Sequence, residues 1–162
     1  MMPKRVCDLQ GSFTDGFNQT VSEYKVIAVA IDNSYNAAKV LRRALLLAKS
    51  CSMLYIVHVL QTTLPYGEKS TITIDPSYYE ILQKESMELF VTAEKNIENT
   101  DVNFETLLLE GDPAEEILKF ISEKEVELMI LGSKDKLGST KNLGSVSSKI
   151  AVNAKCSVLI ER

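Results

Sequence analysis

The chain has 162 residues, of which 45 % are hydrophobic and 25 % charged, and its formal net charge at pH 7 is −4. These values are typical of one globular domain with a substantial core. The negative charge gives no general attraction for nucleic acid or an acidic membrane surface. Apolar runs such as residues 26–31 are far shorter than the roughly 18 residues of a membrane span. We therefore expect neither a nucleic-acid partner nor a membrane.

The three cysteines, Cys7, Cys51 and Cys156, are widely spaced and odd in number. This usage suits free thiols in a reducing compartment and offers no metal-ligand spacing, so we expect a cytoplasmic protein without a metal site. Residues 1–22 contain scattered apolar residues, two glycines and no sustained period, which is typical of an N-terminal arm. Residues 23–162 are expected to form one domain.

From Tyr24 onward, short apolar segments alternate with amphipathic ones. Helices are predicted at 34–50, 76–99 and 145–154 and from Pro113 onward, where apolar residues recur every three or four positions. Asp32, Asn33 and Ser34 are candidate N-caps for the first helix, and Asp112 and Pro113 form a clear helix start. Strands are predicted at residues 24–31, 53–60, 102–109, 126–131 and 156–161, because these segments are short and mostly rich in apolar and β-branched residues.

This alternation predicts an α/β, Rossmann-like fold with a five-stranded parallel sheet in the order 3-2-1-4-5 and helices on both faces. The third strand is the least apolar and is expected near an edge. In such sheets ligands bind beyond the carboxyl ends of the strands, where the strand order reverses.

A few side chains are candidates for chemistry. Asp32 ends the first strand, where its carboxylate can accept hydrogen bonds from ribose hydroxyls or cap the following helix. A phosphatase nucleophile there would want a second acid two residues on, where Ser34 stands. His58, the only histidine, lies on an apolar strand, which favours a packed residue with one bonded nitrogen over a base or metal ligand. Met53, Met87 and Met129 are expected in the core.

The most informative segment is residues 131–147, which follows an apolar strand and carries Gly132, Gly138 and Gly144. A glycine-rich loop before a helix can present backbone N–H groups to a phosphate. The spacing matches neither a Walker A motif nor the dinucleotide fingerprint. The residues alone leave two alternatives, a phosphate site and a turn without a ligand.

Taken together, these segments resemble the universal stress protein family from Tyr24 to Arg162. The matching segments are 30–34, 58–59, 110–117, 128–133, 143–147 and 156–160. The resemblance implies a flavodoxin-like sheet and a homodimer joined along the last strand, Cys156–Ile160.

In one branch of the family an adenine nucleotide is bound, and the resemblance carries its site to this chain. Asp32 would face the ribose, the backbone of Val59 the adenine, and Gly132, Gly144, Ser145, Val146 and Ser147 the ribose and phosphates. Ala30, Ile31, Leu131 and Ser133 complete the implied site. The implied ligand is ATP or AMP/ADP, with Mg only where ATP is bound.

This chain departs from the ATP-binding pattern of the family, which is Gly, two residues, Gly, nine residues and Gly-Ser/Thr. Asp135 replaces the second glycine, and eight residues separate it from Gly144. A carboxylate beside a triphosphate is unfavourable, although Lys134, Lys136 and Lys141 can compensate and Gly138 supplies flexibility. We therefore expect AMP or ADP to bind nearly as well as ATP.

Three functions fit these observations. The first is a stress-response protein that binds an adenine nucleotide and acts through a protein partner, which the sequence does not identify. The alternative is the same fold with a degenerate pocket, a dimeric interaction protein. The third, slow ATP hydrolysis, is the only enzymatic form expected, and it is disfavoured because neither Asp135 nor His58 is clearly placed to orient water.

Overall fold

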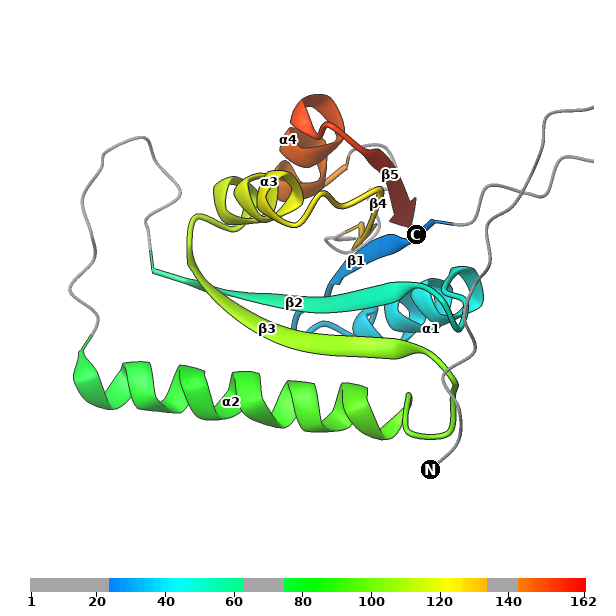
Figure 1. The fold of residues 1–162 in the computed structure, drawn as a ribbon. Helices are drawn as coiled ribbons and strands as arrows, with labels where there is room; N and C mark the ends of the chain where they lie inside the picture. The colour runs from blue at the N-terminus through cyan, green and yellow to red at the C-terminus, as the bar shows by residue number, and fades with distance from the viewer. Residues whose placement is uncertain (1–23, 63–74, 134–142) are drawn as a thin grey trace, which may run out of the picture.

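The computed structural model describes residues 24–62, 75–133 and 143–162, so the predicted N-terminal arm lies outside the described residues. Strands and helices alternate along the chain, as the sequence predicts (Figure 1). In chain order the elements are β1 (Val26–Ala30), α1 (Ala37–Leu47), β2 (Met53–Gln61), α2 (Pro76–Lys95), β3 (Asn103–Gly111), α3 (Pro113–Glu123), β4 (Leu128–Gly132), α4 (Ser145–Asn153) and β5 (Ser157–Glu161).

The five strands form one sheet in the order β3-β2-β1-β4-β5, and every pairing is parallel. This confirms the predicted fold class and strand order, including the place of β3 at an edge. The order follows from the connections, because each helix returns the chain to the same end of the sheet before the next strand begins.

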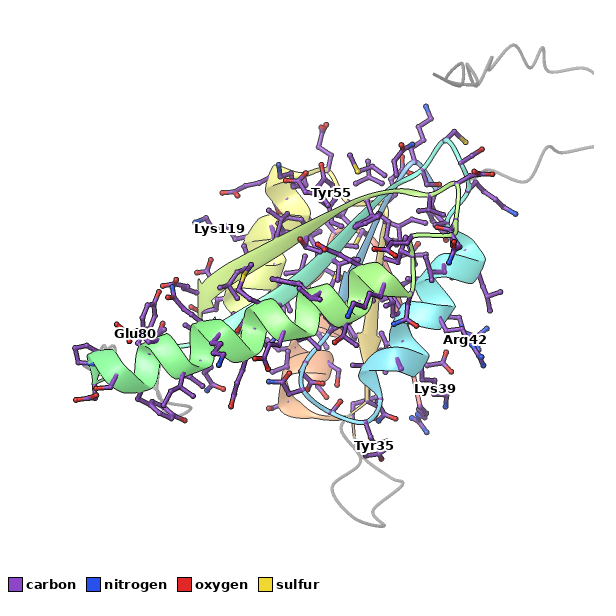
Figure 2. The ribbon with its side chains drawn as sticks, turned by 90° about the horizontal axis from the view of Figure 1, so that it is seen from below. Tyr35, Lys39, Arg42, Tyr55, Glu80 and Lys119 are labelled. Carbon is purple, nitrogen blue, oxygen red and sulfur yellow. The ribbon has the colours of Figure 1, made fainter. Side chains whose placement is uncertain are left out.

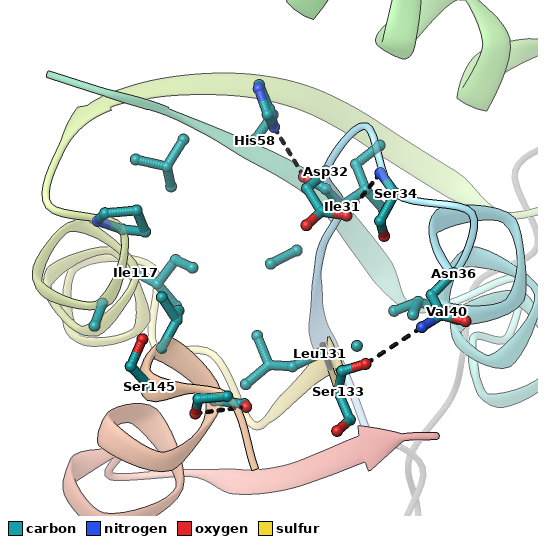
Figure 3. Close-up of a pocket in the computed structure, with 18 of the residues that line it drawn as sticks. Ile31, Asp32, Ser34, Asn36, Val40, His58, Ile117, Leu131, Ser133 and Ser145 are labelled. Atoms are coloured by element: carbon teal, nitrogen blue, oxygen red, sulfur yellow. Dashed lines mark hydrogen bonds between the residues drawn. The ribbon is translucent and has the colours of Figure 1, made fainter. Parts of the chain in front are cut away.

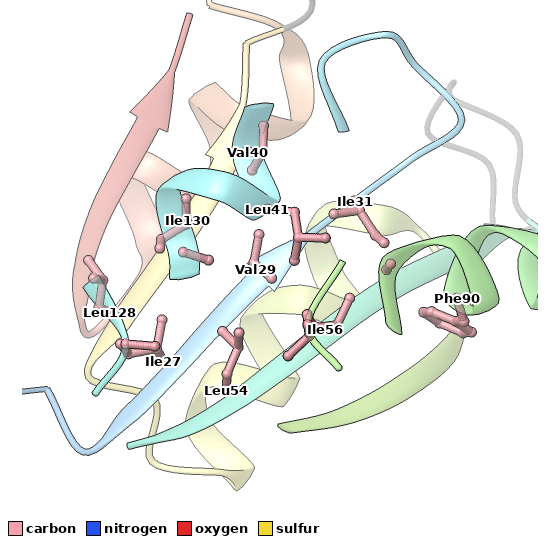
Figure 4. Close-up of a cluster of buried hydrophobic side chains, with 14 residues drawn as sticks. Ile27, Val29, Ile31, Val40, Leu41, Leu54, Ile56, Phe90, Leu128 and Ile130 are labelled. Carbon is pink, nitrogen blue, oxygen red and sulfur yellow. The ribbon is translucent and has the colours of Figure 1, made fainter. Parts of the chain in front are cut away.

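Helices cover both faces of the sheet. Buried side chains of β1 and β2 pack against α1 and α2 on one face, around Ile27, Val29 and Ile56 (Figure 4). Ala28 points to the opposite face and packs with residues of α3 and α4. Successive strand residues point to opposite faces, so a strand covered on both sides is apolar throughout. Each large aliphatic side chain fully buried here stabilises the fold by about 1.5–3 kcal/mol.

The start of α1 differs from the prediction. The helix begins at Ala37 and not at residue 34, and its N-cap is Asn36. Asp32 and Ser34 form a turn instead, because the Asp32 Oδ1 atom accepts a hydrogen bond of 3.1 Å from the Ser34 N–H. The predicted N-cap role of Asp32 is therefore wrong. Figure 2 shows α1 beside α2 on the same side of the molecule, with Tyr35 and Lys39 extending outward.

Other boundaries shift by a few residues for local reasons. β3 continues to Gly111 because it stays paired with β2 as far as Gln61. β4 begins at Leu128 because the Val126 N–H still bonds to Ile121 in the turn after α3. Three helices end earlier than predicted: α1 at Leu47, where Ala48 becomes extended, α2 at Lys95, with Asn96 as its C-cap, and α4 at Asn153. The observed bounds of β1, β2 and β5 differ from the predicted ones by one or two positions.

One predicted core residue is on the surface. Met129 is fully buried, but Met87 is 57 % exposed on α2. The buried side of α2 is formed by Ser86, Phe90 and Ala93, so Met87 lies away from the sheet. In the part of the chain that the structure describes, no helix has the length and apolar character needed to cross a membrane.

Candidate functional site

A cavity of about 640 Å³ opens at the carboxyl ends of β1, β2 and β4 (Figure 3). The chain passes from β1 to β2 on one side, while β4 lies on the other side of β1, so the strand order reverses at this point. Ligand sites of open α/β sheets lie at such positions. The first turns of α1, α3 and α4 contribute the remaining walls.

All eleven residues that the sequence places in the site line this cavity. They are Ala30, Ile31, Asp32, Val59, Leu131, Gly132, Ser133, Gly144, Ser145, Val146 and Ser147. The fold thus brings four separate segments to one place. Asp135 and the lysines near it lie outside the described residues, so the expectations about them remain predictions.

The end of β1 is held by two hydrogen bonds. The Ile31 N–H donates to Val57 O at 2.9 Å, and the Ile31 carbonyl lies 2.9 Å from Nδ1 of His58. The His58 ring also packs edge-on against Phe90, with 6.4 Å between ring centroids. The expectation of a packed histidine with one bonded nitrogen is confirmed, and its contact supports the backbone just before Asp32.

The first turn of α4 forms another wall. Its N-cap is Gly144, which has no side chain to bond the helix N–H groups, and the Ser147 hydroxyl donates to the Gly144 carbonyl at 3.0 Å. The first N–H groups of a helix have no acceptor within the helix, and they carry the positive end of its dipole. This arrangement suits an anion.

The end of β4 lies against the first turn of α1. A Cβ atom on Gly132 would be 3.2 Å from Cγ2 of Val40, so glycine allows the helix to approach the strand closely. Ser133 is 4 % exposed, and its backbone N–H donates to Glu161 O at 2.8 Å. The Ser133 carbonyl accepts a hydrogen bond of 3.3 Å from the amide of Asn36.

The start of α3 also borders the cavity, although the sequence does not indicate that it belongs to the site. Gly111 has a φ of 143°, a conformation open mainly to glycine, and turns the chain from β3 into α3. Asp112 caps the helix by accepting from the Glu115 N–H at 2.9 Å. The helix start was visible in the sequence. Its place follows from the rule that every helix after a parallel strand begins at the carboxyl edge of the sheet.

Lys149 of α4 joins α3 across this wall. Its ammonium lies 3.2 Å from a Glu115 oxygen and 3.6 Å from Asp112. The pKa of Lys149 lies above its ordinary value, chiefly because its ammonium donates a hydrogen bond to Glu115; desolvation acts in the opposite direction, and attraction to Asp112 and Glu115 raises the pKa further. The cation is therefore retained at neutral pH beside the cavity.

The lining separates into apolar and polar parts. Ile31, Ala114, Ile117 and Leu131 are nearly fully buried and form an apolar part of the lining, which we call the apolar slot. Asp32 stands at the edge of this slot, and the α4 N-terminus forms a further wall. Among the described residues no cluster of three or more metal-ligating side chains occurs. The arrangement can hold a flat apolar group, hydroxyls and an anion.

The sheet order, the cavity at the point of reversal and the helix N-terminus in its wall define a Rossmann-like α/β protein. The chain belongs to the universal stress protein family, whose family model matches residues 23–162. Universal stress protein YxiE of Bacillus subtilis is 34 % identical over 147 residues, which cover 86 % of this chain and 99 % of YxiE.

Solved structures show the same fold at lower identity. Universal stress protein UspA from Lactobacillus plantarum superposes with a TM-score of 0.71 at 22 % identity, over 87 % of this chain and 99 % of that one. An Arabidopsis thaliana family protein solved with AMP bound has a TM-score of 0.59 at 16 % identity, over 84 % and 90 %. A universal stress protein in complex with cAMP has a TM-score of 0.57 at 20 % identity, over 87 % and 98 %.

Proposed function

We propose that the cavity binds an adenine nucleotide and that the protein regulates a partner protein according to the nucleotide it holds. The observation that carries the proposal is the convergence of an apolar slot, the Asp32 carboxylate and an uncapped helix N-terminus in one cavity. The relatives solved with AMP and with cAMP support the choice of adenosine carrying a phosphate.

Each part of such a ligand has matching chemistry in the cavity. The slot beside Val59 and Ile117 suits a planar base, and Asp32 can accept hydrogen bonds from ribose hydroxyls. The first turn of α4 would hold the phosphate nearest the ribose through backbone N–H groups. The cavity volume of about 640 Å³ lies within the range of small-molecule sites, which is roughly 300–1,000 Å³.

The proposal does not require a preference for ATP. Asp135 and the shortened loop are expected to weaken the hold on the distal phosphates, so AMP or ADP should bind nearly as well as ATP. Magnesium would be present only with ATP, as the counterion of its phosphates. Hydrolysis is not part of the proposal.

We also propose a homodimer joined along β5. This strand ends the sheet on the side of β4, and Val158, Leu159 and Ile160 are only partly buried. An apolar edge strand presents unpaired N–H and C=O groups, which a second copy related by a two-fold axis can pair.

Mass spectrometry of small molecules released from the purified, denatured protein tests the nucleotide directly, with the Asp32→Ala variant prepared in parallel. An adenine nucleotide released by the wild type and depleted in the variant would support the proposal. If the wild type releases none and shows no thermal shift with added AMP, ADP or ATP, the degenerate-pocket alternative is correct.

A further inference from the structure

The first turn of α1 makes an unusual contact with the end of β4. Asn36 is the N-cap of α1, yet its side chain makes no capping hydrogen bond, and its backbone is helical, with φ −79° and ψ −15°. An N-cap asparagine usually adopts an extended backbone and accepts from an N–H of the first turn. Here the side chain serves another partner.

That partner is a backbone group of the cavity wall. The Asn36 Nδ2 atom donates to the carbonyl of Ser133, which is 97 residues away in the chain, at 3.3 Å (Figure 3). The Ser133 N–H donates to Glu161 O at 2.8 Å. Both backbone polar groups of Ser133 are therefore held, one from α1 and one from β5.

Packing reinforces this contact. Val40 lies one turn after Asn36 and close to Gly132. A Cβ atom added to Gly132 would be 3.2 Å from Cγ2 of Val40 and 3.9 Å from Cβ of Asn36. Gly132, Ser133 and Asn36 all line the cavity. The first turn of α1 thus contacts the last residue of β4, by packing on Gly132, and the residue after it, by hydrogen bonding to Ser133.

We propose that Asn36 is a positioning residue for the phosphate end of the nucleotide. Its amide holds the Ser133 carbonyl and so fixes the backbone at Gly132–Ser133, which lines the cavity and would face the phosphates of the proposed ligand. This inference rests on the proposed function, and it adds a residue outside the glycine segments to that site. Asn36 acts through Ser133 and need not touch the ligand itself.

Two substitutions separate this role from simple helix capping. Serine and aspartate are as good as asparagine at an N-cap, so Asn36→Ser and Asn36→Asp preserve the start of α1. Serine is too short to reach the Ser133 carbonyl, and aspartate replaces the donor with an acceptor. Asn33→Asp is the matched control, because it adds the same charge at an exposed position on the same loop.

The measurement is calorimetric affinity for adenosine, AMP and ATP in the full chain, with amide hydrogen exchange at Ser133 as a second readout. Asn36→Ser should weaken AMP and ATP about 3- to 10-fold, the range for one lost hydrogen bond, and leave adenosine within about twofold. Exchange at the Ser133 amide should accelerate while the unfolding midpoint stays unchanged. Asn36→Asp should weaken AMP and ATP by a similar factor, once the effect of the added charge, measured with Asn33→Asp, has been subtracted.

Two results would overturn the inference. If wild type binds the nucleotides and the Asn36 variants bind adenosine, AMP and ATP as tightly as wild type does, Asn36 has no positioning role and the proposed function still stands. If wild type binds no nucleotide at all, the proposed function fails and this role fails with it.

Discussion

Gly132→Ala probes the closest approach between the cavity wall and a helix. A Cβ at this position would lie 3.2 Å from Cγ2 of Val40, which is tighter than ordinary van der Waals contact. Val40 is 2 % exposed on the buried side of α1, so its side chain has little room to move. The φ angle of Gly132 lies outside the left-handed region, so alanine brings no backbone strain there.

Two opposing effects set the size of the change. Overpacking a close contact costs about 1–3 kcal/mol. Replacing glycine at an ordinary φ returns about 0.4–1 kcal/mol by restricting the unfolded chain. The steric effect is the larger, so Gly132→Ala should lower the free energy of unfolding by about 1–2 kcal/mol.

A double-mutant cycle with Val40→Ala identifies the cause. Val40→Ala alone should cost about 1.5–3 kcal/mol, because it removes two buried methyl groups. In that background the methyl group added by Gly132→Ala enters the vacated space, so this second substitution should then cost nearly nothing. Urea unfolding of the four proteins gives the coupling energy, expected to be at least about 1 kcal/mol. Additivity within about 0.5 kcal/mol would refute the steric explanation.

Three further predictions concern the ligand, the dimer and the pH dependence of stability. Asp32→Ala should weaken AMP, ADP and ATP by a similar factor, about 1–3 kcal/mol by calorimetry, and a loss confined to ATP would contradict a ribose contact. Val158→Pro should give a folded monomer by light scattering. The Ser157 N–H points to β4, so the Val158 N–H points outward, where the second copy would pair with it and where proline has no N–H to offer. A dimer that this substitution leaves intact would show that β5 is not the interface. A hydrogen bond from Arg43 lowers the pKa of Glu161, so this pair stabilises the fold above the ordinary glutamate pKa and loses its effect as the pH falls through the lowered value. Urea midpoints between about pH 6 and pH 3 should therefore fall less in Glu161→Gln than in wild type, and parallel curves would contradict this.

The fold could be predicted from the sequence because the central strands β1 and β4 are short apolar runs buried on both faces, and because strands alternate with amphipathic helices along the chain. The turn from Asp32 to Ser34 could not, because the same polar residues that cap helices also bond to their own backbone in turns. The exposed position of Met87 could not be predicted either. α2 is long and carries apolar side chains on its exposed side as well, so its periodicity alone does not identify the buried face.

The cavity could be predicted only in part. Asp32 after β1, Gly132 at the end of β4 and the Gly144-Ser145 start of α4 could be identified in the sequence, because each stands directly beside a predicted strand or helix. The contact of Asn36 with Ser133 joins residues far apart in the sequence and depends on how closely α1 packs on β4. The pairing of Lys149 with Asp112 depends likewise on how α4 lies against α3. Such contacts require the three-dimensional arrangement.

Calorimetric titration of the whole chain with AMP tests the central claim most directly, since AMP carries the base, the ribose and the one phosphate for which the described cavity has matching groups. We predict saturable binding to one site per chain, with ADP and ATP bound nearly as well and with a matching rise in the unfolding temperature. The absence of heat and of any thermal shift with all three nucleotides would contradict the claim that this cavity is a nucleotide site.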